Sequence, residues 1–147
     1  FGWSLNGRRS LSEFFFNNLS AGKRVNGFVD VLFCPLYVLE LGWLLVEMAE
    51  RRLSGLYHTT GSEALSKYDF GVALAQRFGL DAGLITPISV RDSELTAPRS
   101  PNLTLSTAKL AAALGHTLPG ASDGLDRFAA DYHAGYAERL RTMGTPS

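Results

Sequence analysis

The segments GLYHTTGSE at residues 55–63 and LSKYDF at residues 65–70 decide the fold of this chain. The first is a β-prone run bounded by glycines, and such a run predicts a short strand over residues 55–61. In the second, Ser66 and Asp69 have the spacing of a helix capping box. Apolar residues then recur every four positions, which is typical of a helix. Together the two segments predict a strand followed directly by a helix.

Helices and short strands alternate on both sides of these segments. Ser10 and Glu13 have a second capping-box spacing, which predicts a helix at the N-terminal end. Pro35 interrupts the next apolar region, so we expect two short strands around a kink there. The predicted helices cover 10–20, 38–52, 66–79, part of 104–115 and a last segment that Asp123 or Asp126 would cap, and the predicted strands cover parts of 24–38 and 84–90. This order predicts an α/β or α+β fold whose few strands need a partner sheet that is missing from the chain.

Composition bounds the classes of function. The 147 residues suit one domain, which we place at 1–142 with a frayed tail at 143–147, and the 14 basic and 14 acidic residues cancel. A neutral chain argues against nucleic-acid binding, which needs a basic surface. The longest uncharged apolar run, residues 31–39, is far shorter than the ~20 residues of a membrane span. With one cysteine and no visible signal peptide, a cytoplasmic location is expected.

The usual motifs of cofactor and metal chemistry do not occur. The glycines never take the dinucleotide-binding spacing, and no glycine-rich phosphate loop is present. The three histidines are far apart in the sequence and Cys34 has no cysteine partner, so we predict no metal site. Cys34, in an apolar run, is interpreted as a small core residue, and Ser66 as a helix cap rather than a nucleophile. His116 and His133 are interpreted as surface residues.

Arg99 is the first candidate for binding. It lies between Pro98 and Pro101, and these prolines limit the freedom of the loop. A guanidinium held in this way suits bidentate binding of a phosphate group. From the residues alone, an ordinary surface arginine remains the alternative.

The order of several short motifs resembles the C-terminal half of dTDP-4-dehydrorhamnose reductase-like proteins, which are extended short-chain dehydrogenases/reductases. The motifs at 55–63 and 65–70 are similar to that family, as are the Ala97–Pro98–Arg99 loop with Asn102, the segment 105–110, and the C-terminal positions 114–125. Phe1–Gly2–Trp3 resembles the start of the family's sugar-binding part. The chain departs from the pattern at Ser106 and at Glu40, where the family commonly has Asp.

The resemblance implies that this chain is the substrate-binding part of a reductase. It implies that Arg99 pairs with the diphosphate of a nucleotide-linked deoxysugar, and that Trp3 and Phe33 border the sugar pocket, although Trp3 would serve equally as a core residue. No tyrosine is followed four residues later by lysine, so the family's catalytic Tyr-x-x-x-Lys is missing. The 55–61 strand would join the sheet of an absent N-terminal Rossmann half.

The expected activity therefore belongs to a longer parent. By resemblance, the parent uses NAD(P)H to reduce a keto sugar, whereas this chain alone binds no cofactor and contains no catalytic residue. The alternatives are a sugar-nucleotide epimerase or dehydratase and a non-catalytic module like the regulatory subunit of methionine adenosyltransferase. A homodimer also remains open.

Overall fold

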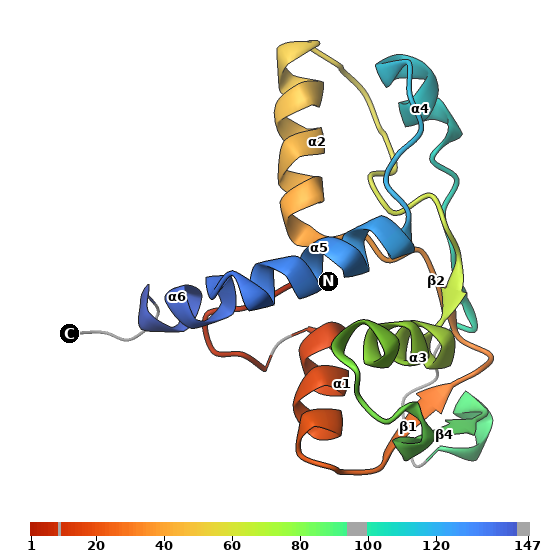
Figure 1. The fold of residues 1–147 in the computed structure, drawn as a ribbon. Coiled ribbons are helices and arrows are strands. Elements are labelled where there is room, and N and C mark those ends of the chain that lie inside the picture. The colour runs from red at the N-terminus through yellow and green to blue at the C-terminus, as the bar shows by residue number, and fades with distance from the viewer. Residues whose placement is uncertain (9, 94–99, 144–147) are drawn as a thin grey trace.

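The computed structural model describes residues 1–8, 10–93 and 100–143 (Figure 1). Its helices and strands follow one another as α1 Leu11–Ser20, β1 Val25–Phe28, β2 Leu32–Phe33, α2 Val38–Glu50, β3 Leu65–Ser66, α3 Lys67–Phe78, β4 Ile85–Ile88, β5 Asn102–Leu103, α4 Ala108–Leu114, α5 Ala121–His133 and α6 Tyr136–Met143. Two short 3₁₀ turns, η1 Ala82–Leu84 and η2 Val90–Asp92, flank β4. The mixed α/β class predicted from the sequence is confirmed.

Side-chain caps begin two of the helices, as the sequence predicts. At α1, the Ser10 hydroxyl accepts a hydrogen bond from the Glu13 amide at 3.1 Å, and the Glu13 carboxylate accepts one from the Ser10 amide at 3.1 Å. At α3, the Ser66 hydroxyl accepts from the Asp69 amide at 2.9 Å. Gly79 ends α3 in the left-handed region, with φ of 62°. These bonds satisfy amides that a helix N-terminus leaves unpaired.

The strands form two small sheets. β1 pairs in parallel with β4, and Gly27 lies opposite Pro87 in that register. β2 lies between β3, which is antiparallel to it, and β5, which is parallel to it. The two predicted strands of the 24–38 region are therefore present. Residues 29–31 separate the two strands, so the interruption comes before Pro35, which follows β2.

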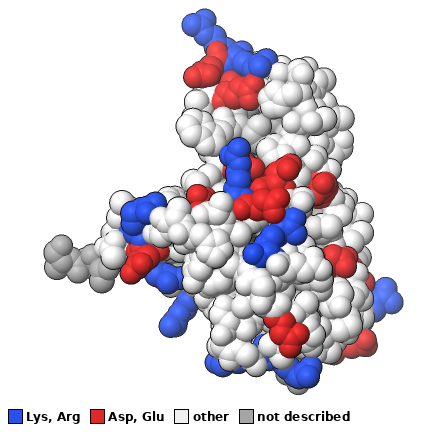
Figure 2. Space-filling view, in the orientation of Figure 1, with Lys and Arg blue, Asp and Glu red and all other residues white. Residues whose placement is uncertain are grey.

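The core has two parts. The first is rich in aromatic rings and lies among α1, α3 and α5, and the second is aliphatic and joins α2 to α4. In Figure 1, α2 and α4 stand on one side of α5, and α1 and α3 stand on the other. Basic and acidic side chains are mixed over the face in Figure 2, with acidic ones gathered over α5.

Three predictions about elements differ in detail from the structure. Residues 55–61 pair with no other strand in the described part of the chain, and their pairing with a sheet outside it stays a prediction. The last helix is interrupted at Gly135, which has a φ of 75°. Its N-cap is Gly120, and the predicted capping by Asp123 is met at position N3, where the Asp123 carboxylate accepts from the Gly120 amide at 3.3 Å. α2 ends at Glu50, two residues before the predicted end.

Candidate functional site

The structure describes two of the three predicted substrate-binding residues, Trp3 and Phe33. Arg99 lies outside the described residues. Trp3 is 6% exposed and stacks on Phe128 with ring centroids 4.0 Å apart, while its indole nitrogen donates to the Phe128 carbonyl at 3.1 Å. Phe33 is half-buried in β2, and its ring packs edge-on against Phe70 at 5.5 Å. Trp3 and Phe33 thus belong to the same core, and their role toward a sugar stays a prediction.

The 55–61 segment is held on the protein by side chains from two directions. Lys109 of α4 donates to the Leu56 carbonyl at 2.8 Å, and its ammonium lies 4.5 Å from the centre of the Tyr57 ring. On the other side, the Thr60 hydroxyl donates to the Cys34 carbonyl at 2.5 Å. The segment is therefore anchored at both ends although it is not part of a sheet.

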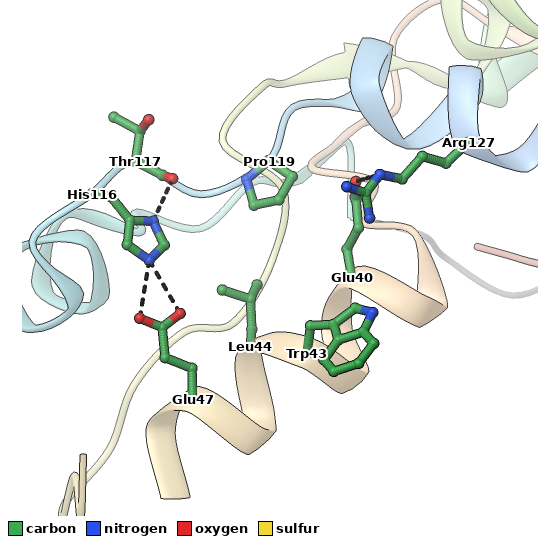
Figure 3. Close-up of a pocket in the computed structure, with 8 residues that line it drawn as sticks. All are labelled: Glu40, Trp43, Leu44, Glu47, His116, Thr117, Pro119 and Arg127. Atoms are coloured by element: carbon green, nitrogen blue, oxygen red, sulfur yellow. Dashed lines mark hydrogen bonds and ion pairs between the residues drawn. The ribbon is translucent and has the colours of Figure 1, made fainter. Parts of the chain in front are cut away.

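A surface groove of about 400 Å³ lies between α2 and the connection from α4 to α5 (Figure 3). The groove combines an exposed indole, an apolar floor and charged groups of both signs. Its lining consists of Glu40, Trp43, Leu44, Glu47, His116, Thr117, Pro119 and Arg127. The α2 residues have helical spacing, so one face of that helix forms a wall.

Glu40 stands at one end of this groove and is 5% exposed. Its Oε1 faces the Arg127 Nε at 3.5 Å, and its Oε2 has no hydrogen-bond partner among the described residues. Burial raises the pKa of the Glu40 carboxyl, and the nearby Arg127 charge opposes that shift. Glu40 is thus a poorly compensated buried acid, which destabilises the ionised form.

Glu47 and His116 meet at the other end of the groove. The His116 Nε2 lies 3.1 Å and 3.3 Å from the two carboxylate oxygens of Glu47. The His116 Nδ1 lies 2.9 Å from the Thr117 carbonyl oxygen. Arg51, one turn along α2, also pairs with Glu47 at 2.8 Å. The hydrogen bonds from His116 and Arg51 hold the pKa of Glu47 below its usual range.

Sequence reasoning found part of this arrangement. The Glu47–Arg51 pair follows from their spacing of four residues on a helix. His116 is exposed, as expected for a surface residue, but its contact with Glu47 was missed because 69 residues separate the two. No local pattern reports such a pairing. The groove therefore rests on tertiary structure.

Among residues 1–8, 10–93 and 100–143, no group of three histidine, cysteine, aspartate or glutamate side chains is placed to hold a metal ion. No helix in the same ranges is long and apolar enough to cross a membrane.

Comparisons with known proteins find similarity in sequence and in fold. Over 81 residues, 52% of this chain, the sequence is 33% identical to methionine adenosyltransferase 2 subunit beta of Xenopus tropicalis, and this stretch covers 24% of that protein. The fold is similar to dTDP-4-dehydrorhamnose reductase from Bacillus anthracis in complex with NADP, with a TM-score of 0.76, 17% identity and coverage of 84% of this chain and 43% of the reductase.

A second solved structure, dTDP-glucose 4,6-dehydratase from Bacillus anthracis in complex with NAD, matches with a TM-score of 0.68 and 11% identity, covering 92% of this chain and 42% of the dehydratase. The chain thus spans less than half the length of each of these enzymes. The family model described as the RmlD substrate binding domain matches residues 2–134. On that match, which extends over nearly the whole chain, this protein belongs to the RmlD substrate-binding domain family.

Proposed function

We propose that this chain is the substrate-binding part of an NAD(P)H-dependent reductase that acts on a nucleotide-linked deoxysugar. The observation that carries the proposal is the family match over residues 2–134. The aligned part, 84% of this chain, covers only 43% of the solved reductase that shares this fold. The remaining part of such a protein would supply the grip on the dinucleotide and the proton donor.

In this proposal the chain positions the sugar nucleotide rather than carrying out the redox step. Arg99 would pair with the diphosphate through charge-assisted hydrogen bonds. Phe33, half-buried at the end of β2, offers an apolar ring beside the small sheet. Trp3 would hold the aromatic core against which Phe33 packs, and would thereby keep the Phe33 ring in a fixed position beside the sugar.

The open face of α2 supports the existence of a second half. Val38, Leu45 and Val46 are each between 44% and 51% exposed on this helix. In the middle of that face, no described atom lies within 4 Å of a Cβ built at Gly42. Glycine within a helix costs about 1 kcal/mol relative to alanine. A partner surface that approaches the helix closely at Gly42 would explain both features, and we assign it to the Rossmann half.

The test uses the full-length parent protein. We expect it to oxidise NADPH or NADH when a dTDP-linked 4-keto-6-deoxysugar is added. Arg99→Ala should lower turnover by about 100-fold, because a charged pair to the diphosphate is lost in a site where positioning sets the rate. Arg139→Ala is the matched control, since among the described residues this guanidinium contacts its own helix region, at the Ala134 carbonyl and the Tyr136 ring. Full activity of Arg99→Ala would exclude the assigned role of Arg99.

A second candidate is a non-catalytic binding module of the same fold. The observation that favours it is the 33% identity to methionine adenosyltransferase 2 subunit beta. A parent that shows no turnover with any nucleotide sugar but forms a stable complex with another protein would support this candidate. The dehydratase match leaves a third activity, which product analysis would detect as loss of water without net consumption of NAD(P)H.

A further inference from the structure

His116 lies where only its doubly protonated form can satisfy its surroundings. One ring nitrogen faces the Glu47 carboxylate at 3.1 Å, and the other faces the Thr117 carbonyl oxygen at 2.9 Å. Both neighbours are acceptors, so each ring nitrogen needs a hydrogen. A neutral imidazole has one N–H and would turn a lone pair toward one of these oxygens. The geometry therefore favours the imidazolium.

The segment that carries His116 connects several parts of the fold. It leaves α4 at Gly115 and reaches the start of α5 at Gly120. Leu118 of this segment is buried in the aliphatic core, and the Pro119 carbonyl accepts from the Ser62 amide at 3.1 Å. The contact of His116 with Glu47 ties the same segment to α2 (Figure 3).

Glu47 has a second partner, Arg51, which remains charged when His116 loses its proton. Arg51 already lies 2.8 Å from the other carboxylate oxygen. Loss of the imidazolium therefore leaves Glu47 paired within α2 and removes only the bond between α2 and the connection. The remaining charges of the groove, Glu40 and Arg127, face each other at its opposite end at 3.5 Å. The two arrangements of Glu47 thus differ by one contact, which joins α2 to the 115–120 connection.

We propose that His116 is a pH-sensitive latch, which as imidazolium holds the 115–120 connection against α2 through Glu47 and as neutral imidazole releases it. The bonds to the Thr117 carbonyl and Glu47 raise the pKa of His116, and the Arg51 charge opposes this shift. Histidine is the side chain that usually serves as a switch near physiological pH. Release loosens the connection beside Trp43, while the buried Leu118 stays in the aliphatic core that also contains Leu44 of α2. This inference does not depend on the proposed reductase function.

The test is hydrogen exchange and histidine NMR on the 147-residue chain at about pH 5.5 and about pH 8, on either side of the ordinary imidazole pKa. The reporters are the amides of Ser62 and Ala121, which bond to Pro119 and Glu63 at the two sides of the connection. After correction for intrinsic exchange, we expect their protection to fall about two- to fivefold at the higher pH, as for loss of an exposed ion pair. Amides within α3 are the internal control.

Two variants separate the latch from general effects of pH. His116→Arg keeps a cation at both pH values and should abolish the fall in protection. His116→Asn has no cation and should show the low protection at both. The latch is refuted if the wild-type reporters keep their protection while NMR shows His116 losing its proton. It is refuted equally if His116→Asn retains the wild-type fall, because another group would then be responsible.

Discussion

Replacement of Gly61 by alanine tests how closely the 55–61 segment is packed on Cys34 and Pro35, which follow β2. A Cβ at Gly61 would overlap the Pro35 carbonyl oxygen and lie 2.9 Å from its carbon, a distance that real Cβ atoms essentially never show. The obstacle is backbone, which cannot rotate away as a side chain would. The Gly61 amide donates a hydrogen bond to the Cys34 carbonyl at 3.3 Å, so a shift of residue 61 away from Pro35 would weaken this bond too.

The magnitude follows from these contacts. Overpacking of a filled interior costs about 1–3 kcal/mol, and a rigid obstacle places Gly61→Ala at or above the top of that range. The lower entropy of alanine in the unfolded chain returns only about 0.4–1 kcal/mol. We therefore expect a loss of about 2–3 kcal/mol in the free energy of unfolding. Urea denaturation of the 147-residue chain, followed by circular dichroism, measures it.

Gly42→Ala is the matched control, because it makes the same chemical change at an exposed position of α2. No described atom lies within 4 Å of the added methyl group, so only helix propensity should change, with a gain of about 1 kcal/mol. The two variants should thus move in opposite directions and differ by about 3–4 kcal/mol. If Gly61→Ala is as stable as the wild type, the close approach to Pro35 is wrong.

Substitutions at three other positions test the core, a helix cap and the buried acid, each by the same urea measurement. Phe128→Ala should cost about 3–5 kcal/mol, because the ring is fully buried and stacked on Trp3, and a cost below 1 kcal/mol would contradict that packing. Ser66→Ala should cost about 1 kcal/mol by removing the cap of α3. Ser66→Asp should not restore it, because the new carboxylate would face that of Asp69, which accepts from the Ser66 hydroxyl at 2.6 Å. Glu40→Gln should stabilise the chain on the order of 1 kcal/mol at pH 7. The pKa of Glu40 is raised in the folded protein, so the wild type loses stability as the pH rises from the pKa of the unfolded chain through that of the folded chain. The gain from Glu40→Gln should therefore vanish in acid. An equal gain in acid and at pH 7 would rule out ionisation of Glu40 as its cause.

The parts of the fold that are predictable from sequence are those whose cause is local. The caps at Ser10 and Ser66 use partners three residues away, so their spacing alone locates the starts of α1 and α3. The left-handed end of α3 follows in the same way from Gly79. The groove is different, since His116 and Glu47 are 69 residues apart and neither lies in a motif. Its formation depends on how α2 and α4 pack.

The 55–61 segment shows why a β-prone sequence does not by itself make a strand. The segment is anchored through Lys109 and the Cys34 carbonyl, but it pairs with none of the described strands. A strand is defined by hydrogen bonds to a neighbour, and the segment's own residues cannot supply them. If the Rossmann half of the parent presents a sheet edge here, the segment needs no large rearrangement to extend that sheet, because both of its ends are already fixed. Amide exchange at residues 56–59 should then be slow in the full-length parent and fast in the 147-residue chain; equal rates in the two would show that this segment joins no sheet.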